Sequence, residues 1–261
     1  MKLIIRKIKN IVKLNNKYHF TYMAASTSFY CIVAAFSVFS LLLQLYNSFF
    51  INEKNFIINK IFDLINPVYY EYFENLVPIL SINSFSNVLL ISLIWSSSRI
   101  ISGYNKVSDL IYVCEKKRNY IVNRISSFFF FCVFFLIVVF GFVSVIFASK
   151  LVKKIINNLF LYYLIQFSIE IILVYLLMCV LYIYLPPKKM KFKEVNFNSF
   201  LVSVFIYIFT NGIIWLFTFI QNINPKFGIS SIFSLFFLWV YIINLIIVFG
   251  IYLNYISNKH H

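Results

Sequence analysis

The segment from Leu159 to Leu185 decides the fold class of this chain. Its sequence is LFLYYLIQFSIEIILVYLLMCVLYIYL, in which Glu170 is the only charged residue. A helix that crosses the hydrocarbon core of a membrane needs about 20 mostly apolar residues. The segment is longer than that, and neither proline nor glycine interrupts it. It therefore predicts a transmembrane helix.

Five further runs have the same apolar character, so the sequence predicts six transmembrane helices. In chain order the six runs are His19–Tyr46, Phe85–Ile101, Ile125–Ser149, Leu159–Leu185, Asn198–Ile220 and Ile229–Ile256. A membrane β-barrel would instead show stretches of about 10 residues that alternate in polarity. The predicted fold class is therefore all-α, a polytopic membrane protein.

The composition of the whole chain supports the same class. Of its 261 residues, 62% are hydrophobic and only 12% are charged, whereas a typical soluble domain has about 25% charged residues. So few polar residues could not cover the core of a water-soluble domain. Intrinsic disorder requires low hydrophobicity and is excluded as well. Four cysteines in this length also exclude a disulfide scaffold.

The distribution of basic residues predicts the orientation in the membrane. Most of the 23 Lys and Arg residues lie before the first run, between the second and third runs, and between the fourth and fifth. Loops rich in Lys and Arg face the cytoplasm, so both termini are predicted to be cytoplasmic. The basic cytoplasmic loops then account for the net charge of +15, which would attract anionic lipid headgroups. No nucleic-acid partner is expected.

The sequence divides into three parts on this basis. Residues 1–18 form a basic cytoplasmic segment, residues 19–256 form the transmembrane domain, and residues 257–261 form a cytoplasmic tail whose two final histidines are consistent with an affinity-tag remnant. Within the domain, the outer loop 47–84 carries apolar and aromatic residues at helical spacing. We therefore expect amphipathic helices there, lying near the headgroups.

Glu170 is the first candidate for a functional residue. Carboxylates inside a membrane span are costly and mark functional sites by default. Gln166 lies four residues before Glu170 and Tyr163 lies seven before it, so the three share one helix face. This face predicts either a polar site for a substrate headgroup or a proton, or a structural carboxyl that is hydrogen-bonded or neutral.

Three further polar residues in the predicted spans are candidates for substrate contact. Asn211, followed by Gly212, lies in the fifth run and Asn244 lies in the sixth. Amides at such depth commonly bond to a neighbouring helix, which is the alternative to a substrate contact. Arg99 lies near the end of the second run, where its side chain either extends to the interface or meets an anionic headgroup.

The sequence offers no catalytic machinery. It contains no phosphate-binding loop, no H-E-x-x-H and no G-x-S-x-G motif. Its eight acidic residues are scattered, whereas a hydrolytic nuclease needs clustered carboxylates to hold metal ions. We therefore expect a protein that is not an enzyme, without catalytic residues, metal or other cofactor.

Several short motifs together resemble the YihY/BrkB family of bacterial inner-membrane proteins. In order along the chain they are Ala24–Tyr30, Trp95–Ser98, Tyr184–Pro186, Phe227–Gly228, Leu238–Tyr241 and Leu253–Asn254. The chain departs from the family pattern at Ser37, where a proline is common, at Arg99, where a small glycine is common, and at Tyr252, where an acidic residue is usual. The acidic position is thus lost here, and Glu170 is the one carboxylate that could have taken over its role.

The resemblance implies a six-helix inner-membrane protein. Members have been linked to virulence and to lipid or envelope traffic, and some carry the label ribonuclease BN. Combined with the polar groups in the spans, this favours a transporter of an amphiphilic or anionic lipid-like substrate. The alternatives are a membrane scaffold or assembly protein that transports nothing and, less favoured, a membrane ribonuclease. The substrate, the energy source and the oligomeric state stay open.

Overall fold

A computed structural model describes six stretches of the chain. They are residues 19–49, 86–112, 119–136, 159–187, 190–223 and 228–259. The predicted basic segment 1–18 and nearly all of the outer loop 47–84 lie outside these stretches, so the amphipathic helices expected in the loop stay a prediction.

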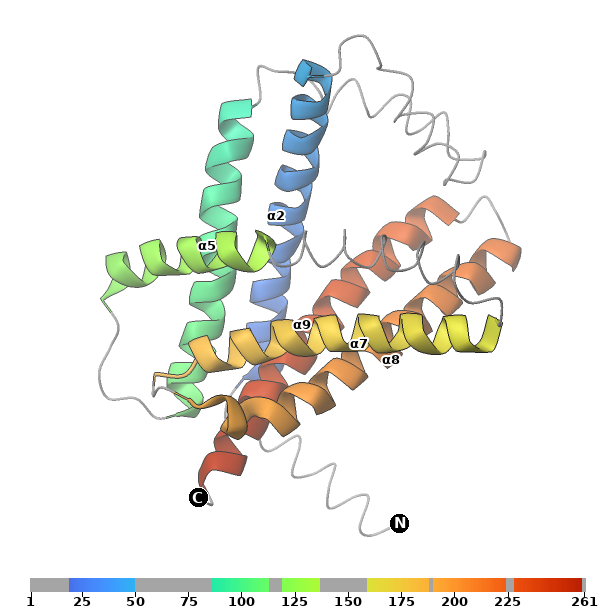
Figure 1. Ribbon diagram of the computed structural model, residues 1–261. Helices are drawn as coiled ribbons and strands as arrows, with labels where there is room; N and C mark the ends of the chain where they lie inside the picture. The colour runs from blue at the N-terminus through green and yellow to red at the C-terminus, as the bar shows by residue number, and fades with distance from the viewer. Residues whose placement is uncertain are drawn as a thin grey trace.

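All secondary structure in the described stretches is helical, as predicted. Five helices are labelled in Figure 1: α2 (Phe20–Phe49), α5 (Ser86–Ile111), α7 (Leu159–Tyr184), α8 (Phe192–Ile223) and α9 (Gly228–Lys259). A sixth, apolar helix spans Tyr120–Leu136. The helix α8 begins six residues before the predicted run, because the Glu194 carboxylate accepts a hydrogen bond from the Lys191 backbone N–H and closes the first turn.

Four helices are long and apolar enough to cross a membrane: α2, α7, α8 and α9. They correspond to the first, fourth, fifth and sixth predicted spans. The second predicted span lies in α5, which carries a series of buried serines and is not among the four. Only the first half of the third predicted span is described, as the helix Tyr120–Leu136. The protein is thus a helical membrane protein, and the count of six spans stays a prediction.

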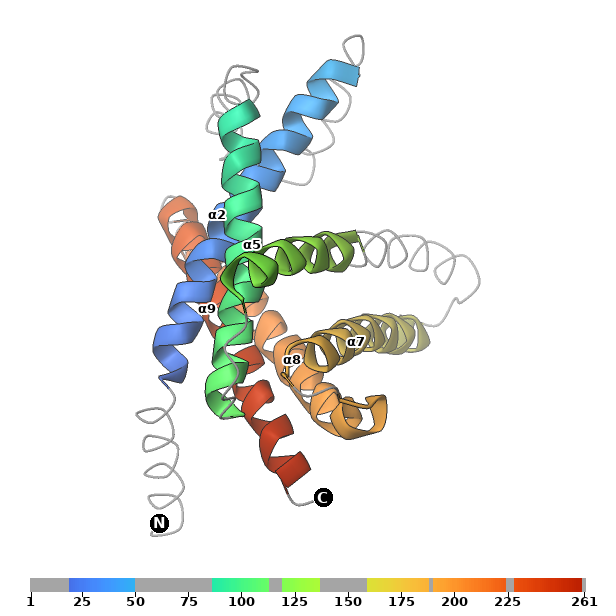
Figure 2. The same ribbon diagram turned by 90° about the vertical axis from the view of Figure 1, so that its left-hand side faces the viewer.

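The helices α2, α5 and α9 form the centre of the described assembly. The helix α2 packs against both α5 and α9, α5 also touches α9, and α8 lies between α9 and α7. Figures 1 and 2 show that α7 and the helix Tyr120–Leu136 lie crosswise to α5. This crossing brings residues of the Tyr120–Leu136 helix against the middle of α5.

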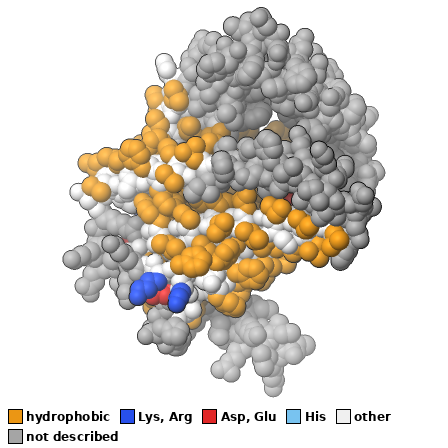
Figure 3. Space-filling view, viewed as in Figure 1, with side chains coloured by type: hydrophobic (Ala, Val, Ile, Leu, Met, Phe, Trp, Pro, Cys, Tyr) orange, Lys and Arg blue, Asp and Glu red, His pale blue; other side chains and the backbone are white. Residues whose placement is uncertain are grey.

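The surface of the described helices suits a hydrocarbon solvent. Many large apolar side chains are exposed, including Phe29, Phe197 and Trp215. On the face shown in Figure 3, hydrophobic side chains cover most of the described surface and the charged ones gather in one small patch. A soluble monomer rarely exposes apolar patches of this extent, so this surface supports a membrane location.

Candidate functional site

Glu170 and Gln166 interact directly on α7, as their spacing predicts. The Gln166 side-chain amide donates to a Glu170 carboxylate oxygen at 3.1 Å, and both residues are partly buried. Tyr163 lies on the same helix, but its side chain is outside the described part of the structure. Glu170 is therefore held by a neutral neighbour on its own helix and keeps acceptor capacity for a ligand or a proton.

Asn211 does not make the interhelical hydrogen bond that was expected of it. Its side chain is exposed and its amide donates to the Tyr207 carbonyl of α8 at 3.0 Å. A Cβ placed on Gly212 would meet nothing within 4 Å, so no helix approaches closely at this point. The Tyr207 ring meets Phe167 edge to face, which brings the turn carrying Asn211 close to the turn carrying Gln166.

Asn244 is the central connection between three helices. Its side-chain oxygen accepts from the Tyr104 hydroxyl of α5 and from the Cys31 thiol of α2, and its amide donates to the Val240 carbonyl of α9. The residue is 3% exposed. Its hydrogen-bonding groups are thus used within the protein, which favours the interhelical role over substrate contact.

Arg99 lies close to two aromatic rings, one on α2 and one on α5. Its guanidinium carbon is 5.0 Å from the Trp95 ring centroid and 5.9 Å from that of Tyr30. The side chain of Arg99 therefore packs within the helix assembly, against α2 and its own helix α5.

Arg124 joins Arg99 at the same indole ring, a contact that the sequence pattern does not predict. Its guanidinium carbon is 4.8 Å from the Trp95 centroid. It donates to the Ser98 hydroxyl at 2.9 Å and to the Tyr120 hydroxyl at 3.0 Å. In the sequence Arg124 stands directly before the third predicted run, and its proximity to Trp95 depends on the crossing of two helices.

Polar contacts continue along the same helix crossing. The Asn105 amide donates to the Asn123 side-chain oxygen at 2.9 Å, and the Asn123 amide donates to the Ser102 hydroxyl at 3.4 Å. Among the described residues, the Asn105 side-chain oxygen and the Ser108 hydroxyl are buried without a hydrogen-bond partner. The crossing is therefore a polar interface with unused hydrogen-bonding capacity.

The candidate residues fall into two groups. Glu170, Gln166 and Asn211 lie on α7 and α8, whereas Arg99 and Asn244 lie around α2, α5 and α9. Within the described ranges no hydrogen bond or ring contact joins the two groups, and no cluster of His, Cys, Asp and Glu could hold a metal ion. The structure thus gives two separate polar regions.

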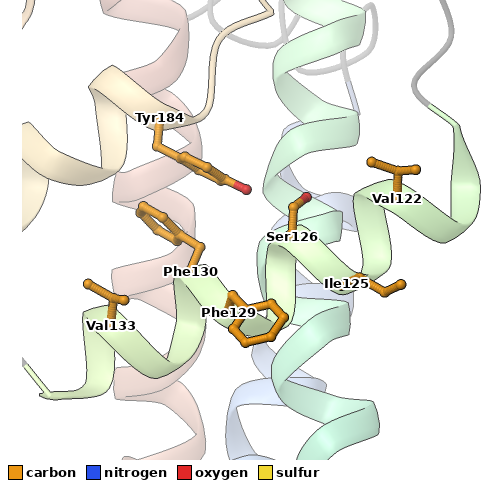
Figure 4. Close-up of a pocket in the computed structure, with 7 residues that line it drawn as sticks. All are labelled: Val122, Ile125, Ser126, Phe129, Phe130, Val133 and Tyr184. Atoms are coloured by element: carbon orange, nitrogen blue, oxygen red, sulfur yellow. The ribbon is translucent and has the colours of Figure 1, made fainter.

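The larger of two described pockets is an apolar groove beside the helix Tyr120–Leu136. Its volume is about 620 Å³. It is lined by Val122, Ile125, Ser126, Phe129, Phe130, Val133 and Tyr184. Figure 4 shows the Tyr184 ring over Phe130, to which it stacks at 3.8 Å, with its hydroxyl directed toward the side where Ser126 lies. Such a lining suits an acyl chain better than a headgroup.

The second pocket lies between α8 and α9. It has a volume of about 280 Å³ and includes Thr210, which accepts a hydrogen bond from the Trp239 indole at 3.1 Å. Neither of these two pockets includes Glu170.

The comparison with protein families tests the resemblance to the YihY/BrkB family. The family model described as "Virulence factor BrkB" matches residues 12–261. The chain belongs to this family. The match covers all the described helices and confirms the YihY/BrkB resemblance. No curated protein and no solved structure matches the chain. The comparisons therefore assign neither a ligand nor a reaction to it.

Proposed function

We propose that this protein transports an anionic, lipid-like amphiphile across the bacterial cytoplasmic membrane. One observation carries the proposal. Arg99 holds a positive charge among membrane helices, and no described carboxylate forms an ion pair with it. A charge at the centre of a span costs about 3 kcal/mol on insertion scales. An anionic ligand that enters from the membrane would offset that cost.

The polar groups of α7 and α8 support movement of the ligand rather than binding alone. Glu170, Gln166 and Asn211 are only partly buried or exposed, and their hydrogen bonds to described residues lie within their own helices. They do not fasten one helix to another. They are therefore available to a headgroup that passes along this side of the assembly, with both termini placed in the cytoplasm by the basic loops.

The alternative function is a scaffold that assembles envelope components and transports nothing. The centre of the molecule favours this function, because Asn244 and the pair Asn198–Asn254 are buried and form hydrogen bonds between helices. A rigid centre is also compatible with transport along its outer side. Only a measurement of lipid movement separates the two functions.

Replacing Glu170 with glutamine tests the transport function. We expect purified protein in vesicles to move a fluorescent anionic lipid between leaflets, and Glu170→Gln to slow this movement by about fivefold, which corresponds to the loss of one hydrogen bond or proton-binding step. The measurement is dithionite quenching of the labelled lipid over time.

Glu194→Gln is the matched control. Glu194 is exposed at the start of α8 and interacts with the Lys191 backbone, so this change removes the same charge away from the polar groups and should leave the rate unchanged. Wild-type vesicles that move no anionic lipid faster than protein-free vesicles would favour the scaffold.

A further inference from the structure

Two arginines meet at one tryptophan ring. Trp95 and Arg99 are one turn apart on α5, and Arg124 comes from the crossing helix Tyr120–Leu136. The two guanidinium carbons lie 5.0 Å and 4.8 Å from the Trp95 centroid, so the charges can be no farther apart than the sum of these distances. Two like charges at such a range, within one screening length, repel each other.

Aromatic rings hold the two arginines in place. Arg99 also faces Tyr30 and Arg124 faces Tyr120, so each guanidinium lies between the shared indole and a tyrosine of its own. A cation over an aromatic face gains about 0.5–2 kcal/mol. These contacts orient both guanidinium planes and leave the positive charge uncompensated.

Most of the hydrogen-bond donors of this pair are not used by the protein. No described residue accepts a hydrogen bond from Arg99, whose Nε is buried and unpartnered. Arg124 donates one bond each to Ser98 and Tyr120, and its Nε is also unpartnered. Within the described helices no carboxylate pairs with either residue. A guanidinium has five N–H donors, so the pair has ample capacity to bind an anion.

The site is open on the side that faces hydrocarbon. Trp95 is 54% exposed and its neighbours Ile91 and Ile94 are 68% and 50% exposed. An anion that reaches the pair across this apolar surface must carry an apolar body, so we expect a lipid rather than a free ion.

We propose that Arg99 and Arg124 bind the phosphomonoester of a membrane amphiphile, with Trp95 as the residue that positions both. This proposal rests on the proposed function and names its substrate class. A phosphomonoester carries close to two negative charges at pH 7 and three terminal oxygens. It can accept bonds from two guanidinium groups at once, whereas a phosphodiester offers one charge and two free oxygens.

The test is lipid binding to the full-length protein in nanodiscs, measured by native mass spectrometry. Phosphatidic acid represents the monoester, phosphatidylglycerol the diester, and glycerol 3-phosphate the headgroup without its lipid. We expect wild type to retain phosphatidic acid about tenfold more strongly than phosphatidylglycerol, and Arg99→Gln or Arg124→Gln to abolish this preference. Arg99→Lys should keep part of the preference for phosphatidic acid, because lysine keeps the charge but lacks the planar guanidinium.

Lys193→Gln is the control, since Lys193 is an exposed lysine at the start of α8 and the change removes the same charge elsewhere. The proposal is overturned if wild type binds both lipids equally, if the arginine variants keep the preference, or if glycerol 3-phosphate binds as tightly as phosphatidic acid. If the protein exchanges lipids between leaflets but does not prefer phosphatidic acid, only this inference is refuted. If it prefers phosphatidic acid but exchanges no lipid, only the transport function is refuted.

Discussion

Replacing Gly250 with alanine is expected to destabilise the helix assembly by about 3 kcal/mol, the upper range for overpacking a core. A Cβ at this position would collide with the Tyr182 hydroxyl and would lie 2.7 Å from Tyr182 Cζ and 2.8 Å from Val202 Cγ2. Tyr182 is 1% exposed and donates to the Ile247 carbonyl at 3.1 Å. It therefore cannot move aside without losing a buried hydrogen bond, and α7, α8 and α9 must separate.

Gly212→Ala is the control for this prediction, because a Cβ there has open space around it. The measurement is the midpoint of unfolding in mixed micelles. We expect Gly250→Ala to lower the midpoint strongly and Gly212→Ala to leave it unchanged. Equal midpoints for the two variants would show that α7 and α9 do not approach each other as the structure has them.

Replacing Asn244 with leucine is the second change with a large expected effect. It removes the acceptor shared by Tyr104 and Cys31 and leaves the buried Tyr104 hydroxyl with only the Thr27 side chain as a hydrogen-bond neighbour. Interhelical hydrogen bonds in membranes contribute about 0.6–2 kcal/mol, and a buried hydroxyl that loses its acceptor adds about 1–3 kcal/mol. We expect a loss of about 2 kcal/mol, measured in the same micelle titration.

A double-mutant cycle with Tyr104→Phe isolates the contact itself. Tyr104→Phe should recover part of the loss in the Asn244→Leu background, because it removes the hydroxyl that has lost its acceptor. Asn211→Leu is the control, since that amide is exposed and bonds only within its own helix. If Asn244→Leu costs no more than Asn211→Leu, then Asn244 does not fix α2, α5 and α9 together.

The apolar runs predicted the helices well where hydrophobicity alone defines them. The run Leu159–Leu185 matches α7 within one residue, and Ile229–Ile256 falls inside α9. By hydropathy the second run ends at Ile101, but the helical spacing of Tyr104, Val107 and Ile111 predicts that the helix continues beyond it, and α5 does continue to Ile111. Its last turns carry buried Asn105 and Ser108, which lower the hydropathy although they face other helices rather than water.

The sequence predicts contacts between candidate site residues only where both residues lie on the same helix. The spacing of Gln166 and Glu170 predicted that the two share one helix face, and their side chains do form a hydrogen bond, because residues four apart on a helix are neighbours. The contacts of Asn244 with Tyr104 and of Arg124 with Trp95 join residues distant in the sequence. They depend on which helices cross and at what height, which a hydrophobic pattern does not specify.

The central claim is that the arginine pair at Trp95 holds the phosphate of a membrane amphiphile. Electron cryo-microscopy of the protein in nanodiscs that contain phosphatidic acid tests it most directly. We predict density for a phosphate between the guanidinium groups of Arg99 and Arg124, with acyl chains extending along the exposed face of α5. A map in which these arginines are paired with a carboxylate of the chain, or face only water, would contradict the claim.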